Sequence, residues 1–294
     1  MVHVRATADQ WVAGLAELSG QAAEQVGGKA ANLARMRTTG HAVPDGFCVA
    51  AEAYRDALAD DPRMRAVVDE LDLVTAEEPV RLAGLAERAR AVVLDAGLPQ
   101  RLRADIVASY HRLGDVPVAV RSSATAEDLP HASFAGLQDT YLGVTGADEV
   151  VLAVRRCWAS LWTERAVSYR VTNGIDHRTV AIAVVVQVML DATVSGVLFT
   201  ANPVTGNRAE LVVDAAPGLG EAVVSGSVVT DHYLLPADGA AAEQEHGCLD
   251  AARLAELRDI GAMLLCRVKP LTRRVRVHGV RLPGCGRSGG WCSA

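Results

Sequence analysis

Two short stretches of the sequence combine a cation with small residues that let the backbone approach a ligand closely. Gly27-Gly28-Lys29 precedes a helical pattern, so its backbone N–H groups and the helix dipole favour an anion, and the lysine adds a mobile positive charge. Residues 121–141 read RSSATAEDLPHASFAGLQDTY and begin with Arg121, whose guanidinium offers paired donors to phosphate oxygens. The serines and Gly136 that follow suit a loop that closes over a phosphate chain.

Each of these features also has a purely structural interpretation. A Gly-Gly turn before a helix is common without a ligand, and residues 27–29 lack the spacing of a P-loop. Arg121 follows the run VPVAV and is predicted at the end of a strand, where open α/β sheets present ligand-binding side chains. A salt bridge from Arg121 to Glu127 or Asp128 is the alternative, and the residue types alone leave this choice open.

Gln187 interrupts the otherwise apolar run AIAVVVQVML. A polar side chain in a buried strand must be hydrogen-bonded. The edge of an adenine ring beside the strand would provide such a partner, and so would a neighbouring strand in the core. Both interpretations of Gln187 stay open at this point.

The elements that must position these residues alternate between helical and strand patterns. A glycine turn feeds a helix that Gly40 would end, three or four amphipathic helices follow between Tyr54 and Leu113, and one long helix is predicted over 146–170. Strands are predicted over 43–50, 116–120, 139–144, 178–190, 195–203, 209–215 and 227–235. The order predicts an α/β (α+β) fold with an N-terminal α/β lobe over 1–175, a sheet-rich lobe over 176–266, and a cleft between them.

Composition narrows the class of protein. Half of the residues are apolar, the charged fraction is 22 %, and no apolar run is long enough for a membrane span. The N-terminus has no export signal, so we expect a cytoplasmic protein with no membrane partner. A net charge of −6 argues against nucleic acid as a partner, and the six scattered cysteines favour free thiols.

The last 28 residues differ from the rest of the chain. Residues 267–294 hold seven Lys/Arg and no Asp/Glu, so they carry +7 while the preceding residues carry −13. They follow no helical or strand period for long. One hypothesis is a basic arm that binds phosphates or an acidic partner. The other, which we favour, is that the coding frame is lost or the chain is truncated near residue 266, which leaves an atypical or disordered tail.

Several motifs in one order resemble a known family. They are VGGKAANLARM, VAVRSSATAEDLPHASFAGLQDTYLGV, CWASLWTERAVSYR, VVVQVML with SGVLFTANPVTG, and AAPGLGEAVVSG. Together, from about Val26 to Leu235, they resemble the N-terminal ATP-grasp domain, or PEP/pyruvate-binding domain, of phosphoenolpyruvate synthases and rifampicin phosphotransferases.

The resemblance implies an ATP-dependent phosphotransferase of the kinase/dikinase type. Such a domain binds Mg-ATP and passes the βγ-pyrophosphoryl group to a histidine on a separate swivelling domain, so that ATP becomes AMP and phosphate. The resemblance places Lys29 and Arg121 on the phosphates as the catalytic cations, with Gly136 and Thr140 beside them. It places adenine on the hinge strand formed by Gln187, Val188 and Met189.

The sequence departs from the family at its C-terminal end. Family members carry an Asp-Ile-Glu-Trp segment and a Gln-Ser-Arg-Pro-like strand that supply the magnesium ligands, and residues 267–294 contain neither. We therefore expect ATP and Mg²⁺ as cofactors but assign no metal ligand in this chain. The alternative to an active component is a catalytically incomplete nucleotide-binding remnant or binding module.

Overall fold

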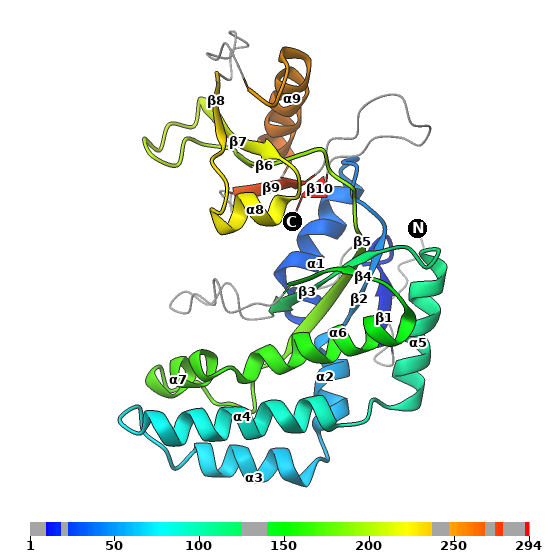
Figure 1. Cartoon of the computed structure of the whole chain (residues 1–294), viewed down its shortest axis with the longest axis vertical. Helices are drawn as coiled ribbons and strands as arrows, with labels where there is room; N and C mark the ends of the chain where they lie inside the picture. Colours follow the sequence, from blue (N-terminus) through cyan, green and yellow to red (C-terminus); the bar gives the residue numbers. More distant parts are fainter. Residues whose placement is uncertain are drawn as a thin grey trace. The chain divides into compact units, whose positions relative to one another are not determined.

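The chain forms two units in the parts that the structure, a computed structural model, describes: residues 10–18, 23–124, 140–236, 247–267, 274–278 and 292–293. One unit comprises Met1–Ala34 and Asp45–Met189, and the other comprises Arg35–Pro44 and Leu190–Ala294. Each contains one five-stranded sheet whose neighbouring strands are antiparallel (Figure 1). Within the described ranges, no helix has the length and apolar content to cross a membrane, and the cytoplasmic location stays a prediction.

The first sheet has β5 at its centre. Its order is β1 (Val12–Gly14), β2 (Gly46–Val49), β5 (Ile182–Val188), β3 (Val118–Ala124) and β4 (Thr140–Val144). We predicted a lobe boundary after residue 175, whereas the units divide after Met189. The reason is that β5 pairs with both β2 and β3 and so belongs to the first sheet.

Helices cover one face of this sheet. Helices α2 (Ala51–Leu58) and α6 (Ala147–Ala159) pack on β5, and α6 also packs on β3. The strand residues on this face, among them Phe47, Val120 and Val184, are buried, and such apolar burial is the main stabilising contribution. With α3 (Pro62–Leu71), α4 (Pro79–Asp95) and α5 (Gln100–Arg112), the region predicted to hold three or four helices contains four.

The long helix predicted over 146–170 is two helices. Helix α6 ends at Ala159, a 3-10 turn η1 spans Ser160–Trp162, and α7 covers Glu164–Thr172. The hydroxyl of Thr163 accepts a hydrogen bond from the Ala166 amide at 3.3 Å and so caps the second helix. The prediction of one helix was wrong because this cap begins a new helix inside a continuous apolar pattern.

Helix α1 (Ala23–Thr38) contains the predicted glycine turn and ends as predicted. Gly27 has φ 75° and ψ 162°, which interrupts the helical backbone directly before Gly28 and Lys29. After Thr38, the amide of Gly40 donates to Arg37 and the amide of His41 donates to Met36. With Gly40 at φ 89°, these two bonds form a Schellman motif, which ends the helix.

The second unit is built around β6 (Val194–Phe199) and β7 (Glu210–Pro217). Its sheet continues through β8 (Asp231–Pro236) on one side, and through β9 (Arg274–His278) and β10 (Cys292–Ser293) on the other. Helix α8 (Gly220–Ser225) follows β7, and α9 (Ala251–Arg267) contributes Leu254 and Leu257 to a core with Leu198 and Tyr233.

Strand β9 lies within the atypical basic tail, where the sequence analysis predicts no regular element. Its backbone pairs with β6 in register from Ser195 opposite His278 to Phe199 opposite Arg274. The segment reads Arg-Val-Arg-Val-His, which alternates with the period of two that suits a strand. The tail therefore contributes backbone to the second sheet through β9 and β10, and each strand is too short to stand out in the sequence.

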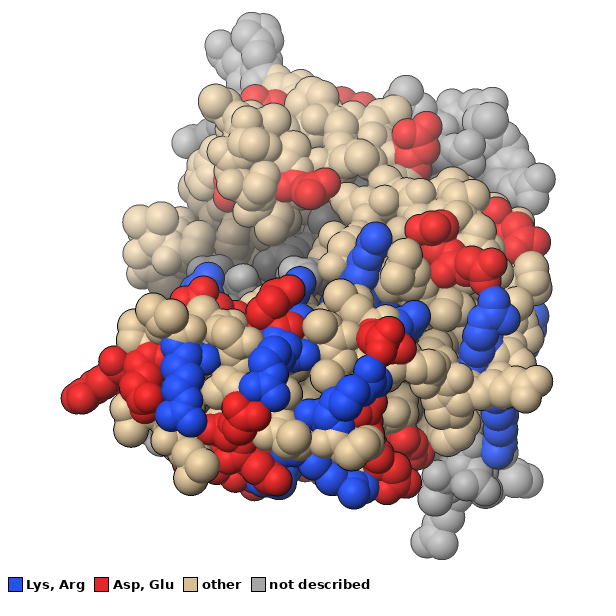
Figure 2. All heavy atoms as spheres, turned by 60° about the horizontal axis from the view of Figure 1, so that its bottom comes forward, with Lys and Arg blue, Asp and Glu red and all other residues tan. Residues whose placement is uncertain are grey.

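The surface formed by α3, α4 and the start of α7 carries both charges. Figure 2 shows basic and acidic side chains interspersed over this face. Many are paired within ion-pair distance, such as Arg88 with Glu70 at 2.8 Å and Arg63 with Asp95 at 2.5 Å. A solvated helical face has this character.

Candidate functional site

The predicted phosphate residues meet on the first sheet. Strands β3 and β4 place Arg121 directly opposite Thr140. Opposite residues of an antiparallel pair project from the same face, with Cβ atoms about 5 Å apart. The sheet therefore brings together two residues that are separated in the sequence by the polar loop.

Arg121 lies inside a strand, not at its end as we predicted. Strand β3 continues through Ser122 and Ser123, which pair with Val184 and Ala183 of β5. The prediction was wrong because two consecutive serines resemble the start of a loop, whereas here both are buried strand residues. The remainder of that loop, with Gly136, lies outside the described residues.

Lys29 reaches the same strand from α1. Its Nζ donates a hydrogen bond to the carbonyl oxygen of Ser122 at 3.0 Å. Ser122 is the neighbour of Arg121, so the ammonium of Lys29 is fixed beside the strand that carries the second cation. Lys29 is thus bonded to the residue next to Arg121, although the two candidate cations are 92 positions apart in the sequence.

The helix and the strand are held together by Ser123. Its hydroxyl donates to the carbonyl of Val26 at 3.1 Å and accepts from the amide of Ala30 at 3.4 Å. The thiol of Cys48 lies 3.7 Å from the same Val26 carbonyl, and burial raises the pKa of this thiol to about 12. Sequence reasoning missed these contacts. The sequence offers one indication: Ser123 is two residues after Arg121, so in a strand the two side chains lie on the same face.

Gln187 lies on the same face as Arg121. It stands opposite Ala119 of β3 and Gly46 of β2, and it is 2 % exposed. Because Ala119 and Arg121 are two residues apart, Gln187, Arg121 and Thr140 project to one side of the sheet. The sheet therefore places the predicted adenine residue and the predicted phosphate residues on a common face.

The two other hinge residues already use their amide groups. The amide of Val188 donates to the Asp45 carbonyl at 2.8 Å, and the amide of Met189 donates to the Pro117 carbonyl at 3.0 Å. The sulfur of Met189 also lies 3.1 Å from the amide nitrogen of Gly143. A hydrogen bond from this segment to a purine would therefore use groups other than these two amides.

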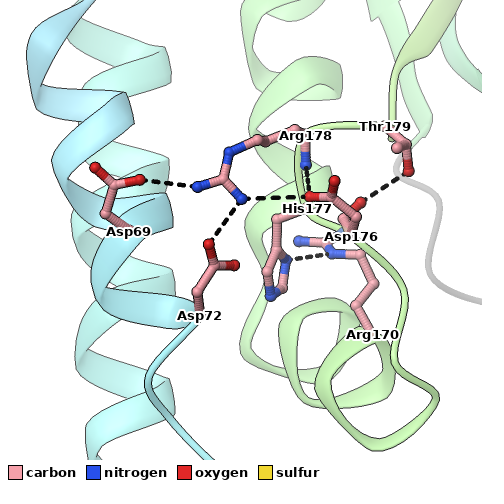
Figure 3. Close-up of polar contacts among 7 residues, drawn as sticks. All are labelled: Asp69, Asp72, Arg170, Asp176, His177, Arg178 and Thr179. Atoms are coloured by element: carbon pink, nitrogen blue, oxygen red, sulfur yellow. Dashed lines mark hydrogen bonds and ion pairs between the residues drawn. The ribbon is translucent and has the colours of Figure 1, made fainter.

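A second polar cluster lies among the helices of the same unit (Figure 3). Arg170 is fully buried, and its Nε donates to Nδ1 of His177 at 2.9 Å. Arg178 forms ion pairs with Asp69 and Asp72 at 2.8 Å each. This cluster ties α7 and the segment after it to α3, and it contains none of the predicted site residues.

No group of three or more His, Cys, Asp and Glu that would hold a metal occurs among the described residues.

Comparison with known families shows which family the chain belongs to. The family described as "Pyruvate phosphate dikinase, AMP/ATP-binding domain" matches residues 23–259. The chain belongs to this family and contains the ATP/AMP-binding domain found in phosphoenolpyruvate synthases and rifampicin phosphotransferases. Helix α1, both cations and strands β2 to β8 fall inside the matched range.

Individual relatives are of both kinds. A rifampicin phosphotransferase of Streptomyces sp is 51 % identical over 209 residues, which are 70 % of this chain and 24 % of the relative. Phosphoenolpyruvate synthase of Pyrococcus furiosus is 43 % identical over 257 residues, 74 % of this chain and 32 % of the relative. A rifampicin phosphotransferase of Bacillus subtilis is 42 % identical over 224 residues, which are 76 % of this chain and 26 % of the relative. The chain thus spans about a quarter to a third of these relatives.

Proposed function

We propose that the first unit binds ATP in an ATP-grasp arrangement, with Lys29, Arg121 and Thr140 on the phosphate chain and Gln187 at the adenine. The observation that carries this proposal is that Arg121 of β3 pairs with Thr140, and that Lys29 is hydrogen-bonded to the same strand at Ser122. A polyphosphate needs several cations and donors that converge before it arrives, because positioning and charge neutralisation supply most of the catalysis in phosphoryl transfer.

The base would be recognised chiefly by Gln187. Its amide is buried on the phosphate-binding face, whereas the amides of Val188 and Met189 bond within the chain. Val188 and Met189 would then contribute carbonyl oxygens and apolar contact to the ring. Gly136 and the predicted cleft between the lobes belong to this proposal as well, and its test does not depend on them.

The reaction belongs to the proposal too. The family resemblance supports transfer of the βγ-pyrophosphoryl group from ATP to a histidine on a separate swivelling domain. This histidine would lie on a domain other than the ATP-binding domain of this chain. The phosphoryl acceptor, whether pyruvate, a rifamycin or water, would be selected there. Mg²⁺ would accompany the ATP, and the described residues give it no ligand set.

The test combines binding with transfer. The purified protein is heated with and without Mg-ATP, and is then incubated with β-³²P-labelled ATP and the separately expressed histidine domain of a relative. We expect ATP to raise the melting temperature and the histidine domain to become labelled. Stabilisation without labelling would favour the alternative, a nucleotide-binding module without transfer. No stabilisation at millimolar ATP would contradict both.

A further inference from the structure

The glycine turn of α1 and strand β3 meet at a contact that fits only glycine. Gly27 has a positive φ, and a Cβ placed on it would overlap the backbone oxygen and the hydroxyl of Ser123. Both the backbone conformation and the lack of space therefore require glycine here. The close approach sets the distance between the helix and the strand.

The hydroxyl of Ser123 fills the break that Gly27 makes in the helix. In a continuous helix the amide of Ala30 would donate to the carbonyl of Val26, four residues earlier. Here the Ser123 hydroxyl donates to that carbonyl and accepts from that amide. Ser123 is 0 % exposed, so the bond is shielded from competing water and its loss would leave buried groups unsatisfied.

This contact lies next to both candidate cations. Lys29 follows Gly27 by two residues, and Arg121 precedes Ser123 by two residues on the same face of β3. The Lys29 ammonium is bonded to Ser122, which lies between Arg121 and Ser123. Lys29 and Arg121 carry like charges, so a rigid support between helix and strand would oppose their mutual repulsion.

We propose that Ser123 is a positioning residue for nucleotide binding: by joining the Gly27 turn to β3, it holds Lys29 beside Arg121 in the geometry that a polyphosphate requires. This inference rests on the proposed function. Ser123 does not touch the nucleotide. It acts through Lys29, and its contribution is to remove the cost of ordering that side chain when ATP binds.

The experiment measures ATP affinity by calorimetry in Ser123→Ala, with Ser160→Ala as the matched control. Ser160 is also buried, and its hydroxyl donates to the Cys157 carbonyl at 2.7 Å, away from the site. At a temperature where all variants are folded, we expect Ser123→Ala to weaken ATP binding about tenfold and Ser160→Ala to leave it unchanged. Ser123→Cys, which keeps a weak donor, serves if the alanine variant does not fold.

A double-mutant cycle with Lys29→Met separates positioning from a purely structural role. If Ser123 acts through Lys29, adding Ser123→Ala to Lys29→Met causes little further loss of ATP affinity. Equal ATP affinity of the wild type and Ser123→Ala, or fully additive losses, would overturn the inference while leaving the proposed function intact.

The rate at which acetic anhydride modifies Lys29, followed by mass spectrometry, provides a readout without nucleotide. We expect this rate to rise several-fold in Ser123→Ala because, without the hydrogen bond to Ser122, the ammonium is no longer favoured over the neutral amine that attacks the anhydride. An unchanged rate would contradict the positioning role. If the wild-type protein failed to bind ATP, the proposed function would fail, and this rate alone would decide whether Ser123 positions Lys29.

Discussion

The Lys29 ammonium donates a hydrogen bond to the carbonyl oxygen of Ser122 at 3.0 Å, which fixes a helix-borne cation to the strand that carries Arg121. Lys29 enters the site from a helix that Gly27 interrupts, and Arg121 enters it from the middle of a buried strand. The proposed site would therefore depend on the helix break as much as on the cations themselves, which leads to the first prediction.

Gly27→Ala is expected to destabilise the protein by at least about 2 kcal/mol, because the new methyl group meets Ser123 and the positive φ is strained for alanine. Gly84→Ala is the control. Gly84 lies inside α4 with open space around its Cβ position, so alanine there should stabilise by roughly 0.5–1 kcal/mol. Urea unfolding measures the free energy of unfolding of both variants. Equal stability of Gly27→Ala and the wild type would refute the close contact.

Thr163→Ala tests the break between α6 and α7. Loss of the hydroxyl that caps α7 should cost about 1 kcal/mol of unfolding free energy. Thr172→Ala, at the exposed end of the same helix, should change stability by less than about 0.5 kcal/mol. Chemical denaturation would show a selective loss in Thr163→Ala if two helices are present, and no loss if one helix runs through residue 163.

Acid should destabilise the protein through His177. Arg170 always donates from Nε, so Nδ1 of His177 must accept and the imidazole must be neutral. Burial, and then the charge of Arg170, lower the pKa of His177 to about 4, despite the opposing effects of Asp72 and Asp176 and with a smaller contribution from Arg178. The unfolded chain therefore binds a proton that the folded protein excludes.

Acid therefore lowers the free energy of unfolding through this histidine. The stability that this site provides is complete above pH 6.5, the pKa of an unperturbed histidine, and is lost as the pH falls through about 4. The full effect is roughly 3 kcal/mol. His177→Gln keeps an acceptor but does not titrate, so its unfolding free energy should fall less between pH 7 and pH 4.5. His111→Gln, at an exposed histidine, is the control, and identical pH profiles of wild type and His177→Gln would contradict the prediction.

Gln187→Leu is expected to weaken binding of ATP by about tenfold or more while leaving inorganic tripolyphosphate binding nearly unchanged. The reason is that the amide of Gln187 would recognise the base, whereas Lys29 and Arg121 would bind the phosphates. Competition calorimetry with the two ligands measures the difference. An equal loss for both ligands would indicate that Gln187 is a core residue whose replacement distorts the whole sheet.

Sequence patterns predicted most elements because their causes are local. The alternating or apolar runs of β2, β3 and β5 and the Gly40 stop of α1 are read directly from neighbouring residues. The division of the long helix at Thr163 and the extension of β3 past Arg121 were not predicted. The helix division depends on the capping hydroxyl of Thr163, and the strand extension depends on pairing of β3 with β5.

The candidate site was likewise predicted only where local residue types indicate it. Cation type and glycine content indicated Lys29 and Arg121, but only the strand register shows that Arg121 faces Thr140 and shares a side with Gln187. The role of Ser123 could not be read from the sequence, because its partners Val26 and Ala30 lie more than 90 positions away. Long-range contacts of this kind carry no local pattern.

The most direct test of the central claim is calorimetric titration of Mg-ATP into the wild type, Lys29→Met, Arg121→Lys and Arg88→Met. Arg88→Met is the control because Arg88 is exposed on α4 and pairs with Glu70. We predict saturable binding by the wild type and Arg88→Met, and about tenfold or greater weakening in each of the other two, since a lysine cannot reproduce paired guanidinium donors. Unchanged ATP affinity in both Lys29→Met and Arg121→Lys would contradict the account.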